Sequence, residues 1–212
     1  PVDALVQALR SRRLRPLLDA AAREGALLTL DMEQYELRDL TLTLARHLLE
    51  AAGGGEKTPL GIVLQAYLRD ADETLEALLA WLAVRRQPLT IRLVKGAYWD
   101  YEVARAAQGG WPAPVYREKG ATDTAFERLT ERLLQAHPLV TTAVASHNLR
   151  TIAPAMALAE ALGVAKERLE FQLLYGMGDA IHAAIAARGY PVRIYTPIGP
   201  LLPGMAYLVR RL

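Results

Sequence analysis

The sequence predicts an α/β fold, specifically a distorted (βα)8 TIM-like barrel of which about six βα units are present. First, six short apolar runs alternate with amphipathic helical patterns along 212 residues. Second, a polar side chain lies at or near the end of every apolar run. Third, no G-x-G-x-x-G motif follows any run, and a doubly wound sheet should show one. Because strand ends at the C-terminal face of a barrel converge on one site, these observations favour the barrel.

The elements follow from hydrophobic periodicity and from turn residues. The segment 100–119 is expected to be a long connection with some helix in its first half, because it contains a Gly-Gly pair and two prolines. The strands are expected at 26–30, 60–64, 89–95, 139–145, 169–174 and 192–195. The helices are expected at 3–23, 37–52, 75–82, 126–134, 150–162 and 179–188, with a last helix from about residue 203.

A single domain is expected, because a chain with 52% hydrophobic residues can bury a substantial core. A closed barrel needs eight strands, and the sequence supplies six. The chain also begins with Pro1 rather than methionine. We therefore expect a single barrel domain over residues 1–212 whose first two strands are missing from the sequence.

Composition excludes several classes of function. No apolar run approaches the ~18 residues of a membrane helix, and no signal peptide pattern is present. Cysteine is absent, so disulfides and thiolate chemistry are not available. The 25 basic and 23 acidic residues are interleaved, which is weak evidence for nucleic acid binding. We expect an intracellular, cytoplasmic protein that binds no nucleic acid.

The third apolar run carries an unusual charge. Arg92 lies in its middle, and Lys95 and Gly96 follow. A guanidinium inside an apolar run is costly unless an anionic or polar group meets it. Gly96 allows the backbone to approach a ligand closely, and Tyr98 and Trp99 supply flat surfaces beside it. The alternative is an edge strand with solvated basic residues.

The end of the chain carries a second signal. In the last expected helix, Tyr207, Arg210 and Arg211 share one face, opposite an apolar stripe. Two guanidinium groups beside one phenol are suited to hold a carboxylate or a phosphate, because arginine presents paired donors in a rigid fork. The alternative is an ordinary solvated helix face.

Five motifs, in order along most of the chain, resemble those of the proline dehydrogenase family. They are RLVKGAYWD at 92–100, ASHN at 145–148, FQLLYGMG at 171–178, RIYTPIG at 193–199 and YLVRRL at 207–212. The loop GWPAPVY at 110–116 resembles the bacterial bifunctional form, proline utilization A. One such motif is a weak signal, whereas five in the same order are specific.

The resemblance implies a barrel that holds FAD without a covalent bond and needs no metal. It also implies oxidation of L-proline to Δ1-pyrroline-5-carboxylate, the first step of proline catabolism, with the electrons passed to ubiquinone. The protein would then be cytoplasmic and would contact the inner membrane peripherally during turnover. In the bifunctional form, a pyrroline-5-carboxylate dehydrogenase domain would be its partner.

The resemblance also implies roles for individual residues. Arg92 is expected near flavin N5, with Tyr98 and Tyr195 as the other catalytic residues. Arg210 and Arg211 are expected to pair with the proline carboxylate. The expected FAD-binding residues are Gln65, Arg92, Lys95, Gly96, Ala97, Trp99, His147, Asn148 and Gln172. The expected substrate-binding residues are Asp31, Tyr98, Leu174, Tyr195, Arg210 and Arg211.

Two other functions are left open by the residues. One is a barrel lyase that forms a Schiff base with Lys95, which lies at a strand end and could act as a nucleophile. The other is a non-catalytic remnant that binds flavin or proline without turning anything over.

Overall fold

Six parallel strands form one sheet that curls into a half-barrel, as the sequence predicts. The computed structural model describes residues 7–51, 58–86, 88–200 and 205. Each strand pairs in parallel with the next one along the chain, which is the strand order of a (βα)8 barrel wall. The strands are β1 (Leu28–Leu30), β2 (Leu60–Gln65), β3 (Leu89–Val94), β4 (Val140–Ala145), β5 (Leu169–Leu174) and β6 (Val192–Tyr195).

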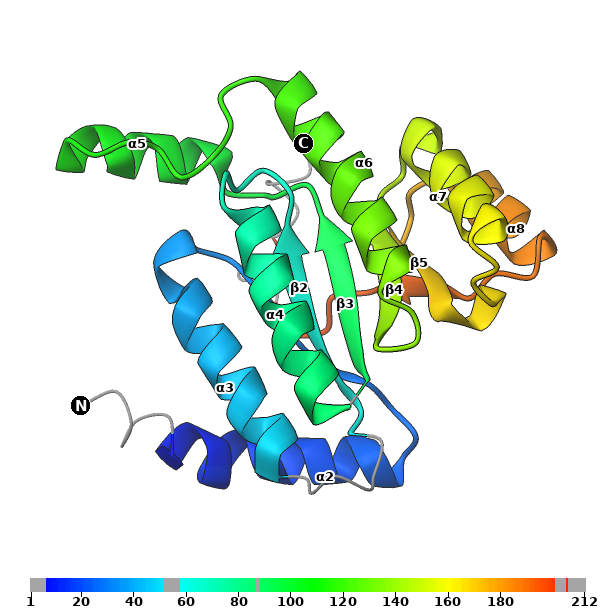
Figure 1. Ribbon diagram of the computed structural model, residues 1–212, viewed down its shortest axis with the longest axis horizontal. Coiled ribbons are helices and arrows are strands. Elements are labelled where there is room, and N and C mark those ends of the chain that lie inside the picture. The colour runs from blue at the N-terminus through cyan, green and yellow to red at the C-terminus, as the bar shows by residue number, and fades with distance from the viewer. Residues whose placement is uncertain (1–6, 52–57, 87, 201–204, 206–212) are drawn as a thin grey trace.

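Helices connect the strands in the expected alternation. Figure 1 shows α4 and α6 in front of β2 and β3, whereas α5 extends away from the rest of the molecule. Helix α5 is the helix expected in the first half of the long connection. The helical segments are η1 (Arg10–Leu14), α2 (Arg15–Arg23), η2 (Tyr35–Leu37), α3 (Arg38–Ala51), α4 (Ala71–Arg85), α5 (Trp99–Gly109), α6 (Lys119–Gln135), α7 (Leu149–Ala161), η3 (Lys166–Arg168) and α8 (Asp179–Ala187).

The hydrophobic core lies between the outer face of the sheet and these helices. Ile91 and Leu93 of β3 are fully buried in one cluster with Leu75 of α4 and Leu129 of α6. Successive side chains of a strand point to opposite faces, so Arg92 points to the inner, concave face. The two faces of the sheet therefore differ in character, and the inner face is the one available for a ligand.

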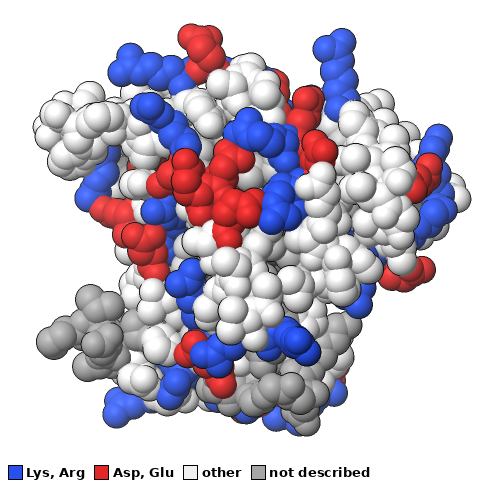
Figure 2. All heavy atoms as spheres, viewed as in Figure 1, with Lys and Arg blue, Asp and Glu red and all other residues white. Residues whose placement is uncertain are grey.

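Ion pairs join α4 to α6 across the surface. Arg128 and Arg132 of α6 each make two hydrogen bonds to a carboxylate of α4, Asp72 and Glu76 respectively. Figure 2 shows basic and acidic side chains side by side over these helices, without a large field of one sign.

Two expectations about secondary structure need correction. The helix expected at 3–23 is not a continuous α-helix, because η1 is a π-helical turn. Pro16 has no N–H to donate to the preceding turn, and the N–H of Arg15 bonds to the carbonyl of Arg10, five residues earlier. The edge-strand reading of 89–95 is also wrong, because β3 lies between β2 and β4.

The last expected helix lies outside the described residues, except for Met205. Tyr207, Arg210 and Arg211 therefore have no described position. Among the residues that the structure does describe, no helix combines the length and the apolar character needed to cross a membrane.

Candidate active site

A cavity of about 410 Å³ opens at the carboxyl ends of the strands. Every strand contributes a polar residue to its wall within two residues of the strand end, as the convergence argument predicts. The volume lies within the ~300–1,000 Å³ range of small-molecule and cofactor sites. The six polar residues are Asp31, Gln65, Lys95, His147, Gln172 and Tyr195.

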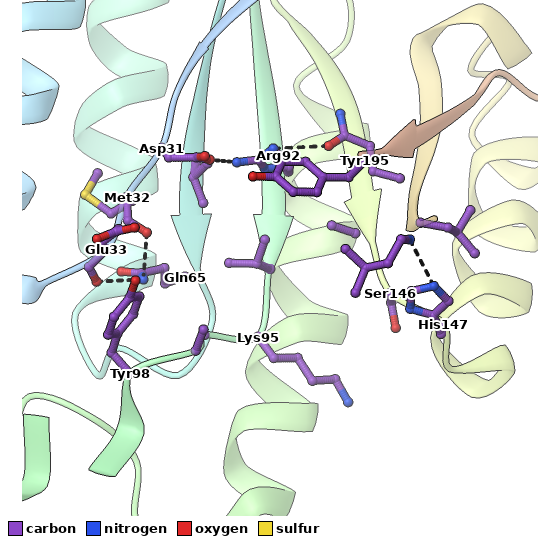
Figure 3. A pocket seen from close by; sticks show the side chains of 18 residues that line it. Asp31, Met32, Glu33, Gln65, Arg92, Lys95, Tyr98, Ser146, His147 and Tyr195 are labelled. Atoms are coloured by element: carbon purple, nitrogen blue, oxygen red, sulfur yellow. Dashed lines mark hydrogen bonds and ion pairs between the residues drawn. The ribbon is translucent and has the colours of Figure 1, made fainter. Parts of the chain in front are cut away.

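Arg92 lies at the centre of the inner face. Its side chain is only 15% exposed and forms an ion pair with Asp31, which follows β1. Its Nη1 also donates to Oε1 of Gln172, on β5, at 3.4 Å. Figure 3 shows the Asp31 and Arg92 side chains meeting across the inside of the sheet. Asp31, two strands away, is thus the anionic partner that the guanidinium of Arg92 requires in an apolar strand.

The Gln172 amide is held from its other end as well. Its Nε2 donates to Oε1 of Glu170 at 2.6 Å. Glu170 accepts two more bonds from Arg193 of β6, both at 2.8 Å, and hydrogen bonding to this carboxylate raises the pKa of Arg193. Charged and polar groups therefore cross the inner face from β1 to β6.

Gln65 offers an unused acceptor. Its Nε2 donates to the carbonyls of Met32 and Glu33, both at 3.1 Å. Its Oε1 is buried and has no hydrogen-bond partner among the described residues. Buried polar atoms are nearly always satisfied, so this oxygen is suited to a ligand N–H.

Lys95 is held toward α6. It forms an ion pair with Asp123, which also accepts from Lys119 at 2.7 Å. Hydrogen bonds from Lys119 and Lys95 hold the pKa of the Asp123 carboxyl below its usual range. Figure 3 shows the Lys95 side chain pointing away from Arg92. A Schiff-base nucleophile must reach the substrate carbonyl, whereas the Lys95 amine contacts a carboxylate of α6.

The turn after β3 requires Gly96. Its φ is +133°, and a Cβ built there would lie 2.5 Å from the ring of Tyr67. Only glycine accommodates both the backbone angle and the ring. This close packing places Ala97 and Tyr98 on the cavity wall.

His147 is held as a neutral imidazole. Its Nε2 accepts from the backbone N–H of Leu174 at 3.1 Å, so the proton of the neutral ring lies on Nδ1. Burial lowers the pKa of His147, and His182 lowers it further, with the two ring centroids 6.5 Å apart. Figure 3 shows His147 at the edge of the cavity.

The structure brings most of the predicted residues together but not all. Trp99 donates its indole N–H to the carbonyl of Tyr116 at 2.8 Å, and Asn148 caps α7 by accepting from the N–H of Arg150 at 3.0 Å. Neither lines the cavity, so their contact with flavin stays a prediction. The predicted residues that line it are Asp31, Gln65, Arg92, Lys95, Gly96, Ala97, Tyr98, His147, Gln172, Leu174 and Tyr195.

Several lining residues were missed by the sequence reasoning. Most of them are neighbours of strand-end residues, and four lie inside the quoted family motifs, so either signal could have found them. They are Met32, Glu33, Val63, Val94, Ala145, Ser146 and Leu173. In the described part of the chain, no group of three or more His, Cys, Asp or Glu side chains could hold a metal ion.

Comparison with known proteins identifies the family. The model of the proline dehydrogenase family matches residues 2–212. The chain belongs to the proline dehydrogenase family. The motif resemblance found in the sequence is thereby confirmed.

Individual members of the family show how far the likeness extends. The bifunctional protein PutA of Escherichia coli (strain K12) is 33% identical over 210 residues, which cover 94% of this chain and 16% of PutA. Proline dehydrogenase 1 of Bacillus subtilis (strain 168) is 31% identical, with 98% of this chain and 61% of that protein covered. The chain thus spans only part of the length of these relatives.

A solved structure of the same family shows the same architecture. The crystal structure of proline utilization A from Bdellovibrio bacteriovorus, inactivated by N-propargylglycine, superimposes with a TM-score of 0.92 at 45% identity. The likeness covers 99% of this chain and 22% of that one.

Proposed function

We propose that the protein oxidises L-proline to Δ1-pyrroline-5-carboxylate with FAD bound without a covalent bond. Family membership over residues 2–212 supports the reaction class. The observation that carries the proposal is Arg92, a largely buried guanidinium on the inner face of a central strand, with Asp31 as its counter-ion. A fixed positive charge of this kind stabilises a ring that becomes electron-rich on reduction.

The cavity fits a flavin. Oε1 of Gln65, which has no partner among the described residues, could accept from an imide N–H, and the N–H groups of Arg92 and His147 could donate to electron-rich ring atoms. When bound, FAD supplies a hydride acceptor at N5. The residues that would hold it are the cavity residues Gln65, Arg92, Lys95, Gly96, Ala97, His147 and Gln172, with Trp99 and Asn148 beyond the cavity wall.

The reaction needs positioning rather than a nucleophile. Proline loses a hydride from a ring carbon and a proton from the ring nitrogen, and a C=N double bond forms. Tyr98, Leu174 and Tyr195 line the cavity and would enclose the ring, which excludes water and orients the carbon. Asp31 stays paired with Arg92 and keeps the guanidinium in place.

The substrate carboxylate is assigned to Arg210 and Arg211, which lie outside the described residues. Charge-assisted bonds contribute on the order of 1.5–3 kcal/mol each. We therefore expect Arg211→Met to raise the Michaelis constant for proline roughly tenfold or more. Dye reduction at varied proline, with the flavin spectrum recorded alongside, measures the effect. An unaltered affinity for proline would show that Arg211 does not bind the substrate carboxylate.

The remaining parts of the proposal concern the whole protein. Ubiquinone is proposed as the electron acceptor, reached by a cytoplasmic protein through peripheral contact with the inner membrane. A pyrroline-5-carboxylate dehydrogenase domain is proposed as a covalent partner, because the PutA relative is named bifunctional and is much longer. In the described sheet, β1 and β6 are the outer strands. We propose that two further βα units lie between them and complete a barrel domain.

One experiment separates the proposal from its rivals. The visible spectrum of the purified protein is recorded without oxygen, before and after L-proline is added. We expect an oxidised flavin spectrum that proline bleaches, and irreversible loss of activity with N-propargylglycine, which inactivates the Bdellovibrio relative. Bound flavin that proline does not reduce would indicate a non-catalytic remnant. A borohydride-trapped adduct on Lys95 without flavin would indicate the lyase, against which the ion pair with Asp123 argues.

A further inference from the structure

We propose that Glu170, paired with Arg193, is a positioning residue that fixes the Gln172 amide and, through it, the guanidinium of Arg92. The proposal deepens the assigned function and rests on the placement of Arg92 beside the flavin. None of the family motifs quoted above contains Glu170, because the nearest begins at Phe171.

The strand register brings these groups together. Glu170 and Gln172 are two residues apart on β5, so their side chains share the inner face. Gln172 pairs in register with Arg193 on β6. Arg193 reaches back to Glu170 and donates Nε and Nη2 to its two carboxylate oxygens, at 2.8 Å each. The Glu170 side chain is 14% exposed, so water competes little for this carboxylate.

The chemistry at both ends allows only one orientation of the amide. Glu170 is an ionised acceptor held by Arg193, so it requires the NH2 group of Gln172, which donates at 2.6 Å. Arg92 has donors and no acceptor, so it requires the carbonyl oxygen of Gln172. If the Gln172 amide were flipped, its oxygen would face the Glu170 carboxylate and its NH2 group would face the Arg92 guanidinium, and both contacts would be repulsive. The carboxylate therefore determines which atom faces Arg92.

The charges along the network alternate and cancel. In spatial order they are negative on Asp31, positive on Arg92, negative on Glu170 and positive on Arg193. If Asp31 were its only partner, the Arg92 side chain could move toward β1. The contact with Gln172, which Glu170 holds in place, opposes that movement. Gln172 is neutral, so it restrains Arg92 from the β5 side without adding a second counter-ion beside Asp31.

The test compares Glu170→Gln with a matched control. Glu76→Gln makes the same change in another carboxylate held by two bonds from one arginine, Arg132, on the outer surface. In FAD-loaded protein, we expect Glu170→Gln to make the flavin reduction potential more negative and to slow reduction by proline about tenfold, the effect of one lost hydrogen bond to a charged group. FAD content should stay near the parent value. Glu76→Gln should change neither quantity.

A double-mutant cycle tests whether Glu170 acts through Arg92. In an Arg92→Met background, Glu170→Gln should shift the potential no further, because the group that it positions is gone. The potential is measured with a chemical reductant and dyes, so the result does not depend on proline oxidation. A parent protein that proline fails to reduce would therefore count against the proposed function alone.

The same cycle can be run in denaturant without flavin. We expect the unfolding midpoints of Glu170→Gln and Arg92→Met to be non-additive, and those of Glu76→Gln and Arg92→Met to be additive. Additive midpoints for the Glu170 pair would overturn the inference. So would a folded Glu170→Gln protein whose flavin potential equals that of the parent.

Discussion

On β3, Ile91 and Leu93 face the helices and are fully buried, whereas Arg92 between them faces the cavity and pairs with Asp31. The same contrast recurs on β5, where Phe171 is buried against the outer core and Gln172 contacts Arg92. One strand thus supplies apolar area to the outer face and hydrogen-bonding groups to the inner face. The difference implies that neighbouring substitutions should have separable effects on stability and on flavin chemistry.

The largest effect is expected on the outer face. Leu93→Ala removes a fully buried side chain and leaves a cavity against the helices, which typically costs about 2–5 kcal/mol of unfolding free energy. Denaturant unfolding measures the loss. In protein that remains folded, the flavin spectrum and potential should match the parent, because Leu93 does not line the cavity. A shifted potential would show that the two faces are not independent.

The corresponding change on the inner face is Arg92→Met, which keeps the length and removes the charge. We expect flavin reduction by proline to slow about a hundredfold, the usual effect of losing one preorganised donor at a reacting centre. The potential should become more negative, and the unfolding free energy should change less than for Leu93→Ala. Rapid-mixing absorbance under anaerobic conditions measures the rate. An unchanged potential with FAD still bound would contradict the role.

The smallest effect concerns pH and His147, which lies at the edge of the cavity. Because burial lowers its folded-state pKa, the folded protein favours the neutral ring. Its contribution to stability is complete above the unfolded pKa, roughly 6.5, and is lost as pH falls through the lower folded value. Protonation also removes the acceptor for the Leu174 N–H.

Urea unfolding of the parent and of His147→Gln over this acidic range measures the contribution. The parent should lose more stability on acidification than the variant, because glutamine keeps an acceptor and does not titrate. Equal pH slopes would show that the ring is not held neutral by its surroundings.

Much of the half-barrel could be predicted because local signals specify it. Arg92 was identifiable because a charge in an apolar run demands a partner. Helical periodicity predicts a continuous N-terminal helix, because it does not report the bond that Pro16 removes. The motif predicts that Trp99 contacts flavin, but it does not predict that the indole N–H donates to the carbonyl of Tyr116, a contact between distant segments.

The Glu170–Arg193 pair could not be predicted from either strand alone. It depends on the register of β5 against β6, which brings Arg193 opposite Gln172. Sequence periodicity shows that a side chain faces inward but not which residue of the next strand lies beside it. Contacts within one element were therefore accessible, and contacts between elements required the structure.

The contact between Gly96 and Tyr67 limits how this chain can vary. A smaller residue at 67 would remove the clash with a new Cβ at 96, but the φ of +133° would still disfavour any L-residue there. The dependence therefore runs in one direction. In a saturation library selected for flavin binding, position 96 should return glycine whatever residue occupies position 67, whereas position 67 should accept other side chains that fill the same space.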